Sequence, residues 1–229
     1  MKNIKQILFS VIFLFILANV GWGQIAAWQL NGALGNEVSI NASTNDANLN
    51  ASVLSRGSGL NISALANAFG ATNYTASGTK ADAITNSKFI QFTINSKSGY
   101  KVSLSTLDAR FRRSSTGPNA FRWQYSVDGS TFIDIGDADI SFTATTTGGV
   151  AQAQINLSGI SALQNVTNAT TINIRLLGWG ATATTGTFAI GRSLTSGTTD
   201  YSLAIGGTVA SLGSDPLILV NPASLTGFS

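Results

Sequence analysis

The sequence of 229 residues contains no cysteine and no histidine. Without an imidazole or a thiol the chain cannot form a Ser-His-Asp or Cys-His triad, and the ordinary zinc ligands are missing as well. Disulfides are also excluded, so stability must come from a hydrophobic core and strand ladders, which a chain of this length can supply. The missing residue types therefore exclude several large classes of enzyme.

Charged residues are scarce, at 10% of the chain, and there are three prolines. Gly, Ser, Thr, Asn and Ala are abundant instead. Thr suits a pleated strand surface, and Gly and Asn tolerate the positive φ of tight turns, so this composition favours short strands over long surface helices. A single all-β domain accommodates a chain of this length.

Residues 1–23 have the three parts of a secretory signal peptide: two lysines, an apolar run over residues 7–17, and small residues just before Gln24. The alternative is a membrane anchor, but the apolar run is shorter than the roughly 20 residues that a spanning helix needs. We expect cleavage before Gln24 and a secreted or cell-surface protein, without membrane contact afterwards.

Removal of this leader changes the charge balance. Two of the 13 basic residues leave with it, so 11 remain against 10 acidic residues, a net charge of +1. A nearly neutral surface does not generate the positive field on which strong nucleic-acid binding depends, so no nucleic-acid partner is expected.

The clearest strand pattern lies within residues 89–136. Phe121, Trp123 and Tyr125 alternate with Arg122 and Gln124, which predicts a strand with an aromatic inner face. In the preceding segment, residues 100–113, the apolar positions change phase by one. A β-bulge near Ser105 and Thr106 would restore the register. Asp128-Gly129 predicts a type I′ hairpin turn, and a second hairpin is expected around Gly148-Gly149.

Shorter apolar segments predict further strands at residues 25–30, 38–40, 52–56, 88–95, 171–177, 187–192 and 201–209. Helical turns are expected at residues 60–69 and 160–166. About ten strands joined by short turns predict an all-β fold, an antiparallel two-sheet jelly-roll β-sandwich that spans residues 24–210.

Residues 211–229 lose this pattern and contain two prolines. We interpret them as a linker and the start of a further domain of a longer protein. The alternative is that residues 217–220 add an edge strand to the main sandwich.

A group of aspartates, Asp134, Asp137 and Asp139, surrounds Gly136 in a predicted loop. Loop carboxylates can ligate calcium together with backbone carbonyls, so a structural calcium ion is a candidate ligand, with a solvated turn as the alternative. Further candidate ligands for such a site are Glu37, Asp46 and Asp200. No other cofactor is expected.

The main basic group lies on neighbouring segments of the same region. Asp108, Arg110 and Arg112 alternate on one predicted strand, and Arg122 and Gln124 share the polar face of the next. If these strands are neighbours, the two sets line one outer sheet surface together with Arg175. Guanidinium groups beside a carboxylate can hold sugar hydroxyls or an acidic sugar through paired hydrogen bonds, and the alternative is a solvated outer face.

Two aromatic residues lie in predicted loops. Trp179 follows Gly178 and precedes Gly180, and Tyr74 lies in an Asn-Tyr-Thr segment. An exposed ring at such positions can stack on a sugar, so both are candidate ligand-binding residues.

Several motifs resemble those of jelly-roll modules from large exported proteins of Bacteroidota-type bacteria. They are AAWQL, FIQFTI followed by GYKVSLSTL, GPNAFRWQYSVDGSTFIDI, TINIRLLGWGA, and a closing strand YSLAIGGTVA that ends before a linker. The resemblance implies a galactose-binding-like or carbohydrate-binding sandwich in a protein exported by the type IX route. It also implies adjoining catalytic, adhesive or immunoglobulin-like domains, and PASLTGFS resembles the start of such a repeat.

Three functional hypotheses follow. The first is a non-catalytic extracellular recognition module that binds a glycan or cell-surface polymer and tethers the accompanying domains. The second is a structural or adhesive spacer without a small ligand. The third is a polysaccharide-active enzyme, which the scarcity of paired carboxylates disfavours because glycoside hydrolysis commonly requires two of them.

Overall fold

The computed structural model describes residues 23–191 and 201–213. In this part of the chain the strands are β1 (Gly23–Trp28), β2 (Ser39–Asn41), β3 (Thr44–Asn45), β4 (Val53–Arg56), β5 (Asn61–Ser63), β6 (Ala68–Thr72), β7 (Phe89–Ile94), β8 (Tyr100–Arg113), β9 (Ala120–Ser126), β10 (Ile133–Asp134), β11 (Ile140–Ser141), β12 (Val150–Ala151), β13 (Ile155–Asn156), β14 (Val166–Thr167), β15 (Ile172–Trp179), β16 (Phe188–Gly191) and β17 (Leu203–Ser211). The helices are α1 (Lys80–Thr85) and the 3-10 helix η1 (Ser161–Leu163).

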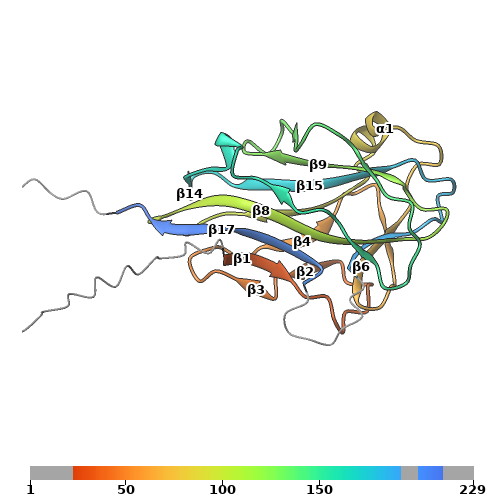
Figure 1. Cartoon of the computed structure of the whole chain (residues 1–229), viewed down its shortest axis with the longest axis horizontal. Coiled ribbons are helices and arrows are strands. Elements are labelled where there is room, and N and C mark those ends of the chain that lie inside the picture. The colour runs from red at the N-terminus through yellow and green to blue at the C-terminus, as the bar shows by residue number, and fades with distance from the viewer. Residues whose placement is uncertain (1–22, 192–200, 214–229) are drawn as a thin grey trace, which may run out of the picture.

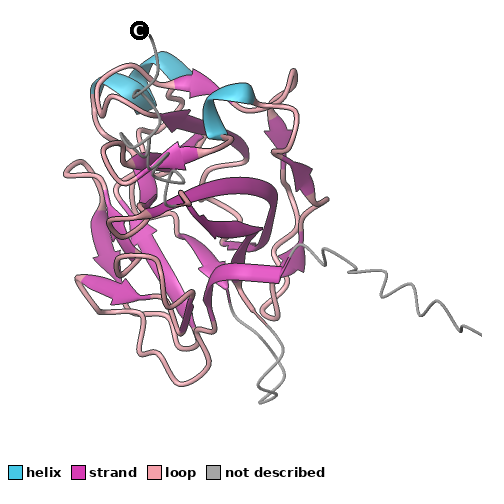
Figure 2. Ribbon diagram, turned by 90° about the vertical axis from the view of Figure 1, so that its left-hand side faces the viewer, coloured by secondary structure: helices cyan, strands magenta, loops and turns pink. Residues whose placement is uncertain are grey.

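The strands form two sheets in which neighbouring strands are antiparallel. The larger sheet has the order β3-β1-β17-β8-β16-β6-β5, and β12, β13 and β14 also pair with β8. The smaller sheet has the order β10-β9-β15-β7-β4-β2, and β11 also pairs with β9. Figure 1 shows β8 and β17 side by side, with β9 and β15 in the layer above them. In the view of Figure 2 the strands curl around the core, which confirms the predicted all-β fold of two antiparallel sheets.

The core lies between the two sheets and is rich in aromatic rings. Trp28 of the larger sheet and Trp123 of the smaller sheet both pack near Phe92, with ring centroids 5.0 and 6.4 Å from it. Phe111 on β8 packs against the rings of Phe121, Trp123, Phe142 and Phe188. The predicted inner face of β9 is confirmed, because Phe121, Trp123 and Tyr125 are all buried.

Strand β8 contains the predicted bulge. Gly206 of β17 lies opposite Thr106, but the next residue, Gly207, lies opposite Leu104, so Ser105 is the extra residue. Inward-facing residues on both sides of the bulge are buried. The extra residue therefore keeps both halves of this 14-residue strand facing the same core.

The hairpin predicted at Asp128-Gly129 is confirmed, because β10 returns antiparallel to β9, but its predicted turn type is wrong, and so is the second predicted hairpin. Gly129 has a φ of +76°, but Asp128 does not share the positive φ that a type I′ turn requires, and residues 127–132 form a wider loop between β9 and β10. The segment around Gly148-Gly149 does not join two paired strands. Strand β11 pairs with β9 in the smaller sheet and β12 pairs with β8 in the larger sheet, so residues 142–149 cross between the sheets.

Residues 60–69, predicted as a helical turn, contain strand β5 and the start of β6 instead. Asn67 adopts a φ of +58°, which ends any helical turn and leaves β5 free to pair with β6. The turn predicted at residues 160–166 is confirmed in part, because η1 lies within it.

Helix α1 was not expected from the sequence. Thr79 and Asp82 form a capping box at its start, since the Thr79 hydroxyl accepts from the Asp82 N–H and the Asp82 carboxylate accepts from the Thr79 N–H. The helix packs against β15. Leu177 of β15 lies on the same face of the strand as Arg175 and is fully buried.

Residues 1–22 and 214–229 lie outside the described residues, so the signal peptide over residues 1–23 and the linker over residues 211–229 remain predictions. None of the helices in the described part of the chain has the length and hydrophobicity needed to cross a membrane.

Candidate functional site

The structure divides the predicted polar surface between the two sheets. Asp108, Arg110 and Arg112 lie on β8 of the larger sheet, whereas Arg122 and Gln124 lie on β9 of the smaller sheet. Strands β8 and β9 are consecutive in the chain but do not pair, because β9 pairs with β15, β10 and β11. The expected single sheet surface is therefore wrong, because the two polar sets lie on different sheets.

On the larger sheet the three predicted residues contact their own strand neighbours. The Gln154 side-chain amide donates to both carboxylate oxygens of Asp108, at 2.9 and 3.1 Å. Arg110 donates to the Gly149 carbonyl at 3.2 Å, and Arg112 donates to the Thr187 hydroxyl at 3.3 Å. These contacts tie the crossing segment and β16 to β8.

On the smaller sheet Arg122 and Gln124 belong to a buried network. Arg122 donates from Nε to Asp139 at 2.7 Å and from Nη1 to the Gly136 carbonyl at 2.7 Å. Gln124 donates to Asp134 at 2.7 Å, and Asp134 also pairs with Lys80 of α1. Burial by itself raises the pKa of Asp134, but the hydrogen bonds from Lys80 and Gln124 outweigh it and hold the pKa below its usual range.

Arg175 is the neighbour of Gln124 on β15 and shares this face. Its Nε donates to the Gln124 carbonyl oxygen at 2.9 Å. The guanidinium carbon lies 3.5 Å from the ring centre of Phe132 and 5.1 Å from that of Phe89. Burial lowers the pKa of Arg175, which is 9% exposed. The structure thus brings together Arg122, Gln124 and Arg175 of the predicted set.

The two aromatic candidates are not exposed loop residues. Tyr74 is 1% exposed and packs edge-on against Phe188, so the prediction of an exposed ring is wrong. Burial raises the pKa of its hydroxyl. Trp179 is the last residue of β15 and is half-buried. The flanking glycines, Gly178 and Gly180, do not end the strand before Trp179, because Trp179 pairs with Ala120 of β9.

The acidic candidates do not converge. Among the residues the structure describes, no three carboxylates lie close enough together to hold a metal ion. Asp134 and Asp139 meet Lys80 and Arg122 instead, and Asp137 is exposed. Glu37 accepts the backbone N–H groups of residues 34 and 35. Asp46 lies in a separate cavity, and Asp200 lies outside the described residues.

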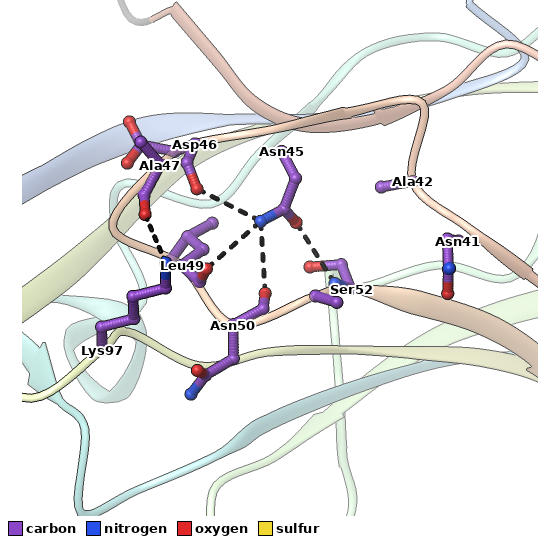
Figure 3. Close-up of a pocket in the computed structure, with 10 residues that line it drawn as sticks. Asn41, Ala42, Asn45, Asp46, Ala47, Leu49, Asn50, Ser52 and Lys97 are labelled. Carbon is purple, nitrogen blue, oxygen red and sulfur yellow. Dashed lines mark hydrogen bonds between the residues drawn. The ribbon is translucent and has the colours of Figure 1, made fainter.

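That cavity lies where the edges of the two sheets meet, and we call it the edge cavity. It has a volume of about 450 Å³ and lies under the loop that leads from β2 through β3 to β4. Strand β3 belongs to the larger sheet, and β2 and β4 belong to the smaller one. The lining residues are Asn41, Ala42, Asn45, Asp46, Ala47, Leu49, Asn50, Ala51, Ser52 and Lys97 (Figure 3).

Asn45 holds the wall of the edge cavity in shape. Its side-chain N–H groups point at the backbone carbonyls of Asp46, Leu49 and Asn50, at 3.2 to 3.4 Å, and its carbonyl oxygen accepts from the Ser52 N–H (Figure 3). The loop is also fixed from outside, because the Lys97 ammonium donates to the Ala47 carbonyl at 2.8 Å. The cavity is therefore formed before any ligand arrives.

Several polar groups around the edge cavity keep unused hydrogen-bonding capacity. The hydroxyl of Ser52 is buried and has no hydrogen-bond partner in the described part of the chain. Asp46 accepts one bond, from the Asn48 N–H, and makes no ion pair with the described residues. Asn41 and Asn50 are exposed, and Asn50 keeps its side-chain oxygen, because its amide nitrogen already donates to the Asn95 side chain and the Ser96 carbonyl. Because the Ser52 hydroxyl is shut off from solvent, the cavity offers amide, carboxylate and ammonium groups to a ligand.

Sequence reasoning missed this cavity. Residues 31–50 have no sustained hydrophobic period, and the sequence predicts one short strand among them, at residues 38–40. The available signal was the density of asparagine between residues 41 and 50, which composition alone does not distinguish from ordinary turn residues.

Comparisons with known proteins leave the family open. No family model and no curated protein matches this chain. Among solved structures, an arabinose-bound α-L-arabinofuranosidase aligns with 17% sequence identity and a TM-score of 0.34. The alignment covers 81% of this chain and 27% of the arabinofuranosidase chain. A TM-score this low carries no argument about what this chain binds.

Proposed function

We propose that this chain is a non-catalytic recognition module of a secreted or cell-surface protein, and that it binds carbohydrate in the edge cavity. The observation that carries the proposal is a preformed cavity of about 450 Å³ in which the side chains of Asn41, Asp46 and Lys97 keep unused hydrogen-bonding capacity. Ligand pockets typically measure roughly 300 to 1,000 Å³ and carry a few convergent polar groups. The resemblance to jelly-roll carbohydrate-binding modules supports the same proposal.

The chemistry of the lining suits hydroxyl groups. A sugar hydroxyl both donates and accepts, and the side chains of Asn41, Asn50 and Asp46 with the Lys97 ammonium provide both kinds of partner. The cavity contains one carboxylate and one ammonium, so it carries no strong net charge. Ala42, Leu49 and Ala51 add apolar surface for the C–H faces of a sugar ring.

A binding role fits this lining better than hydrolysis does. Glycoside hydrolysis commonly needs two carboxyl groups roughly 5 to 9.5 Å apart. Asp46 is the carboxylate among the lining residues. We therefore propose recognition without catalysis, with the bound polymer tethering the domains that accompany this one.

The experiment is a glycan-array screen of the purified chain with an occluded variant. Ala51 is exposed and lines the edge cavity, so Ala51→Trp should fill it without disturbing the core. We expect at least about a tenfold loss of affinity, equivalent to about 1.4 kcal/mol. Ala162→Trp is the matched control, because Ala162 is exposed on η1 and does not line the cavity. Wild-type silence across the array would instead favour a spacer, and product release from polysaccharide would favour an enzyme.

A further inference from the structure

The cations on the outer face of the smaller sheet differ in how they are neutralised. Lys80 pairs with Asp134, and Arg122 pairs with Asp139 at 2.6 Å. Arg175 makes no ion pair with any described residue, although its strand β15 lies further inside the sheet than β9, which carries Arg122. Its hydrogen bond to Gln124 uses a neutral amide as acceptor. Arg175 is therefore an uncompensated positive charge.

Arg175 also keeps most of its hydrogen-bond donors. A guanidinium group has five N–H donors, and one of them, at Nε, is used by Gln124. The two Nη groups have no hydrogen-bond partner in the described ranges, and neither belongs to the polar atoms that are shut off from solvent. These Nη groups form the end of the planar fork that binds a carboxylate through two parallel hydrogen bonds.

Two aromatic rings hold the guanidinium plane in place. Phe132 contacts the guanidinium group from the loop between β9 and β10, and Phe89 contacts it from β7. Both rings are half-buried, so part of each remains exposed to solvent. Gln91 lies opposite Arg175 in the strand register on one side, as Gln124 does on the other. The Arg175 guanidinium, with its free Nη donors, is thus surrounded by the half-exposed side chain of Gln91 and the partly exposed rings of Phe89 and Phe132.

We infer that Arg175, Phe89 and Phe132 form a second binding site, for the carboxylate of an acidic sugar. The guanidinium fork binds the carboxylate, and the exposed ring surfaces contact the C–H groups of the sugar. The inference rests on the proposed function for the ligand being a glycan, but it concerns other residues, because Arg175, Phe89 and Phe132 do not line the edge cavity. It makes the module selective for polymers that contain uronic acids.

The test compares polymers that differ in their carboxylates. Polygalacturonate and polymannuronate are titrated calorimetrically against the purified chain, each next to its methyl-esterified form. We expect the wild type to bind the acidic forms more tightly, and Arg175→Gln to lose roughly tenfold to a hundredfold of affinity for them, the range of hydrogen bonds to charged groups. Arg175→Gln should bind the esterified forms as the wild type does.

Two further variants separate the effect of the positive charge from the effects of the planar guanidinium and of its position on the molecule. Arg175→Lys keeps the charge without the planar fork and should fall between wild type and Arg175→Gln. Lys101→Gln removes a positive charge from the larger sheet and should leave every affinity unchanged. Ala51→Trp should weaken the affinity for acidic and for esterified polymers by the same factor. An affinity loss that comes from the edge cavity is therefore distinguishable from one that comes from Arg175.

The inference is overturned by equal affinity of the wild type for acidic and esterified polymers, by no binding to either acidic polymer, or by an undiminished acidic preference in Arg175→Gln. An equal loss in Lys101→Gln would also overturn it, because the effect would then come from net charge alone. Thermal melting of each variant confirms that it is folded.

Discussion

The arginines of this chain show that the surroundings of a side chain decide its role. Arg56 lies 3.6 Å from the centre of the Phe69 ring and donates from all three nitrogens to the backbone carbonyls of Gly70, Glu37 and Gly35. Burial lowers its pKa to about 10, which still leaves it charged at neutral pH. Arg175 has the same aromatic contact but free Nη groups. Arg56 therefore fastens a loop to the sheet, and Arg175 is available to a ligand.

Asp128 provides a prediction at the same scale. Its carboxylate accepts from the N–H groups of Ser130 and Thr131 and from the Ser126 hydroxyl, and these bonds lower its pKa. A lowered native pKa stabilises the fold above the unfolded value of roughly 3.9 and loses that contribution as pH falls towards the native pKa.

We therefore expect Asp128→Asn to be less stable than the wild type at pH 7, with the difference shrinking below about pH 4. Urea titrations of both proteins between pH 2 and pH 7 measure this difference in unfolding free energy. A difference that stays constant with pH would show that the charge of Asp128 does not contribute.

Among the elements, strand β8 depends on a single extra residue. Ser105 keeps the strand in register with β17 while both of its halves face the core. Because side chains alternate with a period of two, removing one residue turns every side chain on one side of the deletion to the opposite face. Either Leu107 and Phe111 would then face away from the core, or Leu104 would face away from it.

We expect deletion of Ser105 to abolish folding and Ser105→Ala to change the unfolding free energy by less than about 1 kcal/mol. The substitution keeps the bulge and removes a buried hydroxyl that has no partner in the described residues. Far-UV circular dichroism and urea titration distinguish the two variants. A stable deletion variant would mean that β8 slides along β17 to recover its register.

At the scale of the whole molecule, the two sheets share one core. Trp28 belongs to the larger sheet and Trp123 to the smaller sheet, and both pack near Phe92. Segments such as residues 142–149 also cross between the sheets. Neither sheet can therefore lose its structure without exposing the inner face of the other.

This arrangement predicts a single cooperative unfolding transition. In a Trp179→Phe background, Trp28→Phe and Trp123→Phe each leave one of these two core indoles as a fluorescence probe, in the smaller and the larger sheet respectively. In each variant the fluorescence midpoint in urea should coincide with the circular dichroism midpoint. Separate midpoints would show that the sheets unfold independently.

The sequence by itself determined the features that depend on local patterns. Alternation identified the aromatic inner face of β9, and the change of phase in residues 100–113 located the bulge of β8, because side-chain direction follows chain position within a strand. The hairpin at Asp128-Gly129 was also predicted correctly, but its type I′ turn was wrong because the side chain of Asp128 organises a wider loop than a two-residue turn.

Only the tertiary structure decided which strands are neighbours, and the candidate sites depend on that choice. Consecutive strands β8 and β9 lie in different sheets, so Asp108, Arg110 and Arg112 are separated from Arg122, Gln124 and Arg175. Pairing between distant segments aligned Gln91, Arg175 and Gln124 in one row, and the meeting of two sheet edges formed the edge cavity. A local pattern records which way a side chain points, but not which strand lies beside it.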